Sequence, residues 1–317
     1  MRKVASLIGI GGLVALLLAG CGGGPGPGGA TGSDVNGVLT GALTGRAHMP
    51  QALTGKIAFT SDRTGGGDIY VMNADGTGVT RLTHNAAWDL WPAWSPDGSN
   101  IAFTSDRAGG WDIYVMNADG GGVRRLTRSD AGDSEPAWSP DGSKIGFTSD
   151  RTGGGDIYVM NAAGGGVTRL THNAGCLWPA WSPDGSKIAF GSYRAGNWDI
   201  YVMNADGRGV TRLTRNAAYD CDPAWSPDGS KMAFGSYRAS SCDIYVMNAD
   251  GGDVTRLTRN AAWDEDPAWS PDGSNIAFGS DRAGSTDIYV MNADGRGVTQ
   301  LTRNAARDYQ PAWWAPQ

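Results

Sequence analysis

The chain repeats one segment of about 44 residues six times, and this repeat constrains the fold more than any other feature. A tripeptide Pro-Ala-Trp recurs with this period from Pro92 to Pro311. Repeats of this length are typical of propellers and solenoids, and the strand content of each unit distinguishes the two. The hexapeptide Asp-Ile-Tyr-Val-Met-Asn begins at Asp68, Asp112, Asp156, Asp199, Asp243 and Asp287.

Each repeat contains four short segments that are rich in β-branched and aromatic residues, which is typical of strands. In one copy we expect strands at residues 180–181, 187–190, 199–203 and 210–214. A Ser-Pro-Asp-Gly turn joins the first two, with Pro and Gly at the positions that a type I turn prefers. Four strands in about 44 residues leave no room for a helix. The sequence therefore predicts an all-β protein, a six-bladed β-propeller of four-stranded blades over residues 55–317.

The two ends of the repeat region predict how the ring closes. The first repeat begins at its second strand, residues 56–59, whereas the last Pro-Ala-Trp, at residues 311–313, has no second strand after it. We expect the C-terminal strand to pair into the first blade. Closure of this kind leaves only short strand edges exposed.

The repeats resemble the WD40-like (PD40) repeats of TolB-like six-bladed propellers. The resemblance is carried by Pro-Ala-Trp-Ser-Pro-Asp-Gly-Ser, Ile-Ala-Phe, Asp-Ile-Tyr-Val-Met-Asn-Ala-Asp-Gly and Arg-Leu-Thr, which recur in this order. It covers residues 55–317 and implies a binding role in the cell envelope. TolB itself has an α/β domain ahead of its propeller, and here a glycine-rich segment stands in that place.

The first twenty residues read as a secretory signal. Arg2 and Lys3 precede an apolar run, and Leu18-Ala19-Gly20-Cys21 then resembles the lipobox of bacterial lipoproteins. That resemblance implies cleavage before Cys21 and lipidation of Cys21. The alternatives are an ordinary signal peptide or an uncleaved anchor. Residues 1–20 are therefore predicted to be a lipoprotein signal peptide. A Gly/Pro-rich flexible tether follows at residues 21–54.

This N-terminus predicts export and a lipid anchor to a bacterial membrane, with the propeller facing the periplasm or the cell exterior. The acidic balance, a formal net charge of −6, argues against nucleic acid as a partner, because phosphate binding needs a basic surface. We expect a monomer that reaches the membrane only through its lipid.

The segments that enter each blade differ most between copies, and we expect them to form loops around the mouth of the central channel. Loops on a rigid scaffold commonly carry function, and aromatic side chains beside polar ones are typical of recognition surfaces. The alternative is that these segments vary without a functional reason, because the packing there tolerates many side chains. The predicted ligand-binding face comprises Trp88, Asp89, Trp91, Asp133, Glu135, Trp178, Tyr219, Asp220, Asp222, Trp263, Asp264, Asp266, Arg307 and Tyr309.

Other repeated residues are expected to be structural. The inner-strand tryptophans, from Trp94 to Trp313, should fill the space between blades. A salt bridge from Arg63 to Asp68, repeated around the ring, is the expected role of the recurring arginine. One disulfide is plausible in an exported protein, with Cys221 paired to Cys242, or instead to Cys176.

No catalytic motif, phosphate loop or paired zinc motif is visible in the sequence, so we expect neither an enzyme nor a cofactor. The sequence favours an envelope binding or scaffold protein that recognises a protein or peptide through the variable face. A carbohydrate-binding propeller is the alternative. A calcium-dependent hydrolase is the third hypothesis, in which Asp220, Asp222, Asp264 and Asp266 converge on a cation.

Overall fold

A computed structural model describes residues 53–172 and 175–316. The chain divides into two units, and all the described strands lie in the second, Thr54–Gln317. The predicted signal peptide, Cys21 and nearly all of the predicted tether lie outside the described residues. Within the described ranges, no helix is long and apolar enough to cross a membrane.

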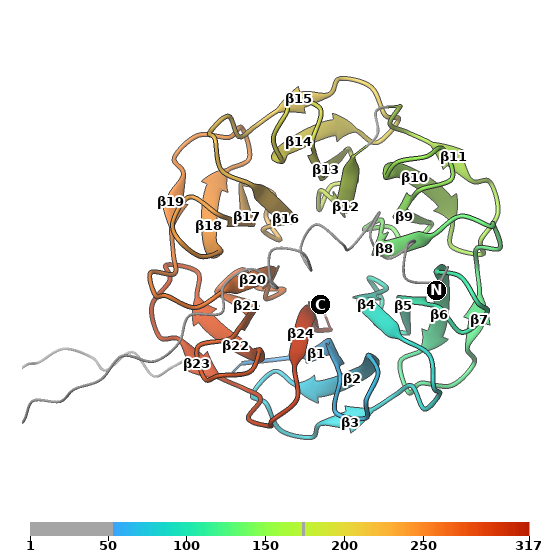
Figure 1. The fold of residues 1–317 in the computed structure, drawn as a ribbon, viewed down its shortest axis with the longest axis horizontal. Helices are drawn as coiled ribbons and strands as arrows, with labels where there is room; N and C mark the ends of the chain where they lie inside the picture. The colour runs from blue at the N-terminus through green and yellow to red at the C-terminus, as the bar shows by residue number, and fades with distance from the viewer. Residues whose placement is uncertain (1–52, 173–174, 317) are drawn as a thin grey trace, which may run out of the picture. The chain divides into compact units, whose positions relative to one another are not determined.

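The second unit consists of six four-stranded antiparallel sheets arranged as blades around a central axis, which confirms the predicted six-bladed propeller (Figure 1). Blades are numbered from the N-terminus, and strands are given from the axis outward. Blade 1 contains β24 (Asp308–Trp314), β1 (Lys56–Ser61), β2 (Asp68–Asn73) and β3 (Thr80–Arg81). Blade 2 contains β4 (Asp89–Trp94), β5 (Asn100–Ser105), β6 (Asp112–Asn117) and β7 (Arg124–Arg125). Blade 3 contains β8 (Asp133–Trp138), β9 (Lys144–Ser149), β10 (Asp156–Asn161) and β11 (Thr168–Arg169).

The remaining three blades repeat this arrangement. Blade 4 contains β12 (Cys176–Trp181), β13 (Lys187–Ser192), β14 (Asp199–Asn204) and β15 (Thr211–Arg212). Blade 5 contains β16 (Asp220–Trp225), β17 (Lys231–Ser236), β18 (Asp243–Asn248) and β19 (Thr255–Arg256). Blade 6 contains β20 (Asp264–Trp269), β21 (Asn275–Ser280), β22 (Asp287–Asn292) and β23 (Thr299–Gln300).

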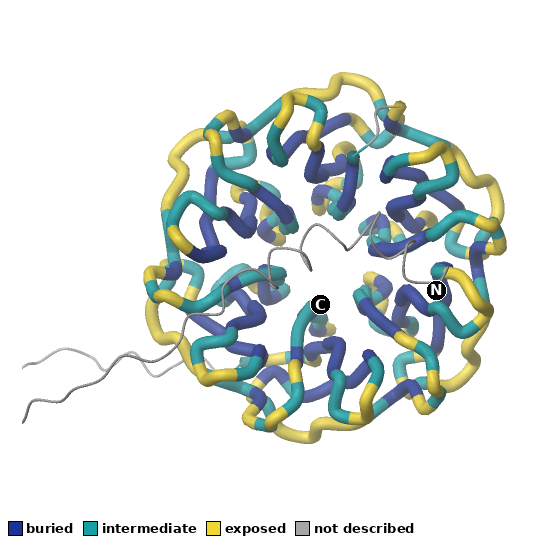
Figure 2. The backbone as a smooth tube through the Cα atoms, in the orientation of Figure 1, coloured by how far each residue is buried: buried dark blue, intermediate teal, exposed yellow. Residues whose placement is uncertain are grey.

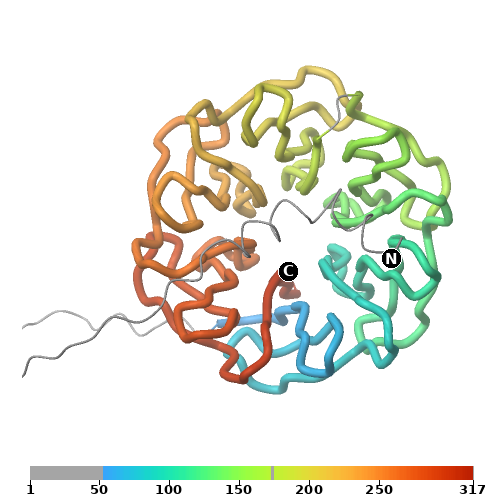
Figure 3. Tube along the Cα trace, in the orientation of Figure 1, coloured from blue at the N-terminus to red at the C-terminus, as the bar shows by residue number. Residues whose placement is uncertain are grey.

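The C-terminal strand β24 supplies the innermost strand of blade 1, as predicted. Trp313 pairs with Ile57, and Asp308 pairs with Ser61. The red strand beside the blue one in Figure 3 marks this closure. The first and last strands of the propeller are therefore held by one antiparallel ladder.

The hydrophobic core lies between neighbouring blades, and the exposed residues gather on the turns and the outer rim (Figure 2). A phenylalanine from each second strand is fully buried and stacks on a tyrosine of the third strand, as Phe59 does on Tyr70 at 5.8 Å. The inner-strand tryptophans pack against these clusters. Trp138 also donates its indole N–H to the Ala93 carbonyl of the previous blade at 3.2 Å. These contacts support the predicted space-filling role.

The predicted Arg63–Asp68 salt bridge is wrong, because each of these residues has a different partner. Arg63 pairs with Asp308 of β24 at 2.7 Å, and Asp68 pairs with Arg81 of β3 at 3.0 Å. The Arg63 guanidinium also lies 4.9 Å from the centre of the Tyr70 ring, within cation–π range. The inner strand begins beside the end of the second strand, so its first carboxylate comes closest to this arginine.

The blade-entry segments, predicted to be loops, belong to the inner strands from their second residue onward. Asp89, for example, already pairs with Ser105 at the start of β4. The equivalent residue is the first of its strand in the other five blades, where it is Asp133, Cys176, Asp220, Asp264 or Asp308.

Candidate functional site: the ring at the channel mouth

A β-bulge recurs in all six inner strands, one residue before the repeated proline. In β4, Leu90 pairs with Thr104 and Ala93 pairs with Ala102, so Trp91 and Pro92 together face a single residue of β5. The residue before each proline has a positive φ, between 51° and 58°. We call these six the ring residues: Trp91, Glu135, Trp178, Asp222, Asp266 and Gln310.

The bulge explains why these side chains meet. An extra residue in one strand bends the strand and re-aims a side chain. The left-handed conformation of a non-glycine residue costs roughly 1–2 kcal/mol, and this cost recurs in every blade. Sixfold repetition of the bulge therefore directs six side chains toward the axis, which a regular strand would not do.

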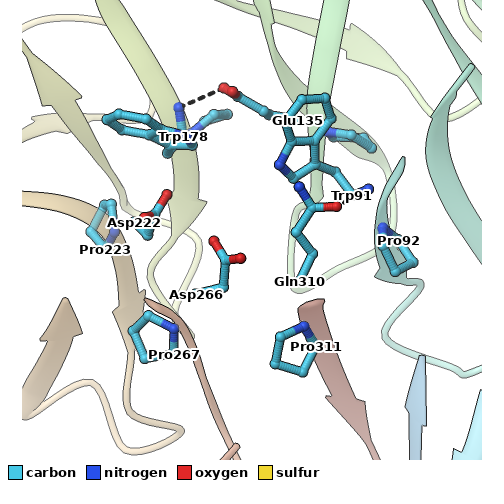
Figure 4. Close-up of a pocket in the computed structure, with 12 residues that line it drawn as sticks. Trp91, Pro92, Glu135, Trp178, Asp222, Pro223, Asp266, Pro267, Gln310 and Pro311 are labelled. Atoms are coloured by element: carbon cyan, nitrogen blue, oxygen red, sulfur yellow. Dashed lines mark hydrogen bonds between the residues drawn. The ribbon is translucent and has the colours of Figure 1, made fainter. Parts of the chain in front are cut away.

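The ring residues and the prolines that follow them line a pocket of ≈ 190 Å³ on the propeller axis (Figure 4). Figure 4 shows the carboxylates of Asp222 and Asp266 and the amide of Gln310 directed into the space between Trp91 and Trp178. The pocket is aromatic on some sides and acidic or amide-lined on the others. Its wall is stiff, because proline fixes the backbone φ angle.

Some ring side chains hold the backbone of the next ring residue. Glu135 accepts hydrogen bonds from the Trp178 backbone N–H at 2.9 Å and from the Thr148 hydroxyl at 2.6 Å. Gln310 accepts from the Trp91 backbone N–H at 3.0 Å. Asp266 accepts in turn from the backbone N–H of Gln310. These contacts link neighbouring blades at the mouth and pre-organise the pocket.

The carboxyl groups at the mouth share a low-dielectric environment. Burial raises the pKa of Glu135 to about 7, and burial with repulsion from Glu265 and Glu135 raises the pKa of Asp222 to about 7. The pKa of Asp266 is raised well above its ordinary value, mainly by burial and then by Asp222. Burial and Asp266 raise the pKa of Glu265 to about 8. A cation bound among these carboxyl groups would favour their ionised forms.

The structure distributes the fourteen predicted site residues among three environments. Trp91, Glu135, Trp178, Asp222 and Asp266 are ring residues. Trp88, Tyr219, Trp263 and Arg307 immediately precede the inner strands, and Trp88 is 44% exposed; Tyr309 lies next to Gln310. Asp89, Asp133, Asp220 and Asp264 are fully buried and pair with Arg107, Arg151, Arg238 and Arg282.

These four buried aspartates belong to the framework, because a ligand at the mouth cannot reach them. Gln310 is the ring residue that the sequence prediction missed. The sequence could have indicated this residue, because Gln310 directly precedes Pro311, just as Trp91 and Glu135 directly precede their own prolines.

The predicted four-carboxylate calcium site does not form. Asp220 and Asp264 face their arginines instead of joining Asp222 and Asp266. Among residues 53–172 and 175–316, no group of three or more His, Cys, Asp or Glu residues is placed to hold a metal ion.

The three cysteines of the propeller are buried. Cys221 and Cys242 are thiols, so the predicted disulfide between them is not formed. Both sulfurs lie against Gly235, 3.1 and 3.2 Å from where a Cβ would stand. Cys176 occupies the framework aspartate position of blade 4, where its sulfur lies 3.3 Å from the Ser192 hydroxyl and 3.5 Å from Arg194.

Comparison with known proteins adds a family match over the whole propeller. The model of the PD40 family, described as the TolB beta propeller domain, matches residues 34–128, 109–178, 172–266 and 238–317. The Tol-Pal system protein TolB of Geobacter sulfurreducens is 51% identical over 45 residues. That match covers 14% of this chain and 10% of that protein.

Two solved structures show the same architecture. TolB from Acinetobacter baumannii superposes with a TM-score of 0.76 at 25% sequence identity, covering 84% of this chain and 68% of that one. The putative TolB from Agrobacterium tumefaciens has a TM-score of 0.68 at 24% identity, covering 82% of this chain and 99% of that one.

Proposed function

This chain belongs to the TolB beta-propeller family, and from this premise we propose that it is an envelope protein that binds a protein or peptide partner at the channel mouth. The proposal is of a binding protein, not an enzyme. The ring residues would make the contacts, and the blades would serve as a rigid scaffold.

One observation carries the proposal: the ring position keeps the same unusual backbone in six blades while its side chain differs. Two blades place tryptophan there, three place a carboxylate and one places an amide. The flanking Pro-Ala-Trp is the same in every copy. Strained backbone conformations that persist tend to mark functional positions. A uniform frame around varied side chains is the arrangement expected of a recognition pocket.

The chemistry of the ring residues suits a peptide. Trp91 and Trp178 offer large apolar surfaces, which commonly provide most of the binding energy at interfaces. Asp222, Asp266 and Gln310 can orient polar groups of the partner. A pocket of ≈ 190 Å³ accommodates one or two side chains rather than a folded domain.

The proposal includes the envelope location. Residues 1–20 would direct export, Cys21 would carry the lipid, and residues 21–54 would tether a monomeric propeller. Membrane fractionation tests this part. The wild-type chain should sediment with membranes, and Cys21→Ser should appear in the soluble envelope fraction. Equal sedimentation of both would contradict the lipid anchor.

The binding proposal is tested by capture from an envelope extract on the immobilised propeller. Replacing both Trp91 and Trp178 with Ala should reduce recovery of the partner at least tenfold. The melting temperature should change little, because both side chains are half-buried at the mouth and lie outside the clusters between blades. The matched control is Trp88→Ala, which removes an exposed tryptophan outside the pocket.

Undiminished capture by the double variant would contradict the proposed site. The carbohydrate alternative is supported by the aromatic side chains at the mouth. A glycan array bound by the wild type but not by the double variant would favour it over a protein partner.

A further inference from the structure

Blades 4 and 5 differ from the other four blades at the residue that accepts one repeated hydrogen bond. In those four, an aspartate before the repeated arginine accepts a backbone N–H from the residue that precedes the inner strand. Asp106 accepts from Trp88 at 2.9 Å, and Asp281 accepts from Trp263 at 2.8 Å. Asp62 and Asp150 make the same contact. Tyr193 and Tyr237 take this position in blades 4 and 5, so two neighbouring blades exchange a repeated carboxylate for an aromatic ring.

Tyr193 belongs to an aromatic group that reaches the channel mouth. Its side chain is 46% exposed, and its ring centre lies 5.9 Å from that of Trp198. Trp198 lies in turn 5.2 Å from the ring residue Trp178. Gly191 makes room for this arrangement, since a Cβ there would stand 2.7 Å from the Trp178 ring. The equivalent residue in blades 1 to 3 is threonine.

Tyr237 joins a second aromatic group across blades 5 and 6. Its ring centre lies 6.1 Å from that of Tyr219 and 5.3 Å from that of Trp263. We call Trp178, Tyr193, Trp198, Tyr219, Tyr237 and Trp263 the aromatic sector. Burial raises the pKa of the Tyr237 hydroxyl, and Cys221, Cys242 and then the carboxyls of Glu265 and Asp222 raise it further. Carboxyls therefore lie near the Tyr237 ring.

The carboxyls in this part of the mouth lack the hydroxyl partners found elsewhere. In blade 3, Thr148 donates a hydrogen bond to Glu135. Gly235 and Gly279 replace that threonine in blades 5 and 6, so no such donor exists for Asp222 or Asp266. Asp222 accepts a hydrogen bond from the Cys221 thiol and Asp266 accepts one from the Gln310 backbone N–H, whereas Glu135 accepts two.

We propose that the aromatic sector, with Asp222, Glu265 and Asp266, is a docking surface for an arginine-bearing segment of the partner protein. A guanidinium stacks on aromatic faces and pairs with carboxylates, and this surface offers both together. Tyr193 and Tyr237 are then specificity-determining residues. This inference rests on the proposed function, because it names the chemistry of the protein partner.

The test replaces both tyrosines with the aspartate that the other four blades carry. Tyr193→Asp and Tyr237→Asp should fold normally, because each new carboxylate can accept the backbone N–H that its equivalents accept. Tyr193 and Asp150 already make the same backbone contact, to Gly175 and Gly132 respectively. The conservative control is Tyr193→Phe with Tyr237→Phe, which keeps both rings.

The probe is an acetylated and amidated hexa-arginine peptide, titrated calorimetrically near physiological salt. The wild type and the Phe variant should bind it within about threefold of each other. The Asp variant should bind at least tenfold more weakly, although it carries two more negative charges. If the peptide were attracted only by net negative charge, the Asp variant would bind it more tightly than the wild type does. Equal or tighter binding by the Asp variant therefore overturns the inference. Wild-type binding of hexaglutamate or chitohexaose at the same tyrosines, without hexa-arginine binding, also overturns it.

The two proposals fail separately. An envelope partner that is lost with the Trp91 and Trp178 variants but retained by the Asp variant would overturn the role of the aromatic sector and leave the proposed function standing. Hexa-arginine binding that depends on Tyr193 and Tyr237, with no envelope protein captured, would support the docking surface and contradict the proposed function.

Discussion

Arg63 and Asp308 lie 245 positions apart in the chain, yet their side chains form an ion pair of 2.7 Å between the first and last strands of the propeller. The Asp308 carboxylate is fully buried, and the Arg63 guanidinium covers the Phe59–Tyr70 stack. The same pair forms inside blades 2, 3, 5 and 6 between residues 18 positions apart. Ring closure therefore reuses the contact that holds an ordinary blade.

Removal of the last strand should destabilise the whole propeller. A chain ending at Arg307 loses β24, the Arg63–Asp308 pair and the burial of Ile57 and Phe59 against Trp313. We expect loss of the cooperative thermal transition, or a melting temperature lower by more than ten degrees, measured by circular dichroism. A chain ending at Ala315 retains all of β24 and is the control. Similar melting of both chains would show that the closing strand is dispensable.

Trp314, at the end of the closing strand β24, is expected to stabilise the closed ring through contacts with blade 2. Its indole N–H donates to the Pro96 carbonyl at 3.0 Å, its ring lies 5.6 Å from that of Trp94, and it covers Gly98. Trp314→Ala should lower the free energy of unfolding by about 1–3 kcal/mol through lost aromatic packing. Urea denaturation would measure this.

Gly98 provides the matching double-mutant test. A Cβ at this position would stand 2.1 Å from the Trp314 ring, and the backbone φ is +68°. Gly98→Ala should therefore destabilise the wild type more than it destabilises the Trp314→Ala chain. Additive effects of the two changes would mean that the two residues are not coupled.

Cys176→Asp should stabilise the protein. Cys176 pairs with Ser192 as Asp89 pairs with Ser105, so an aspartate there can reach Arg194 as Asp89 reaches Arg107. A charge-assisted contact with a half-buried arginine should add on the order of 1 kcal/mol to the free energy of unfolding at pH 7. Cys176→Asn, which adds similar volume without charge, is the control. An Asp variant no more stable than the Asn variant would contradict the pairing.

Stability should fall as pH rises through neutrality because of the carboxyls at the mouth. The pKa of Asp222 is raised to about 7 in the folded protein, so folding favours its protonated form. This contribution is complete below the ordinary carboxyl pKa near 4 and is lost as pH rises through about 7. Asp222→Asn should match the wild type at pH 4 and exceed its stability at pH 8.5 by on the order of 1 kcal/mol.

Asp184 supplies a control of opposite sign. Hydrogen bonds from Ser182 and Ser186 lower the pKa of its carboxyl to about 2. Asp184→Asn should be less stable than the wild type above pH 4 and should approach it as pH falls toward 2. Melting curves across this range check both variants. Identical pH profiles for Asp222→Asn and the wild type would contradict the shift proposed for the mouth.

Part of the candidate site could be predicted from variation among the repeats. Trp91, Trp178 and Asp222 stood out because they lie in the segment before Pro-Ala-Trp, which varies between copies of the repeat. Asp89 and its equivalents were grouped with them because they are only two residues away. That grouping required a guess about side-chain direction, and in a bulged strand the usual alternation does not apply across the extra residue.

By itself, the sequence determined the period of the repeat, the number of blades and the four strands of each blade. It also determined that the C-terminal strand completes the first blade. These features follow from local turn chemistry and from the count of strands, which need no knowledge of distant contacts. Only the tertiary structure decided which aspartate meets which arginine and which six side chains line the channel. Those choices depend on strand register and on the bulge within each blade, which set the direction of each side chain, and on contacts between blades and at the closure, which join segments far apart in the chain.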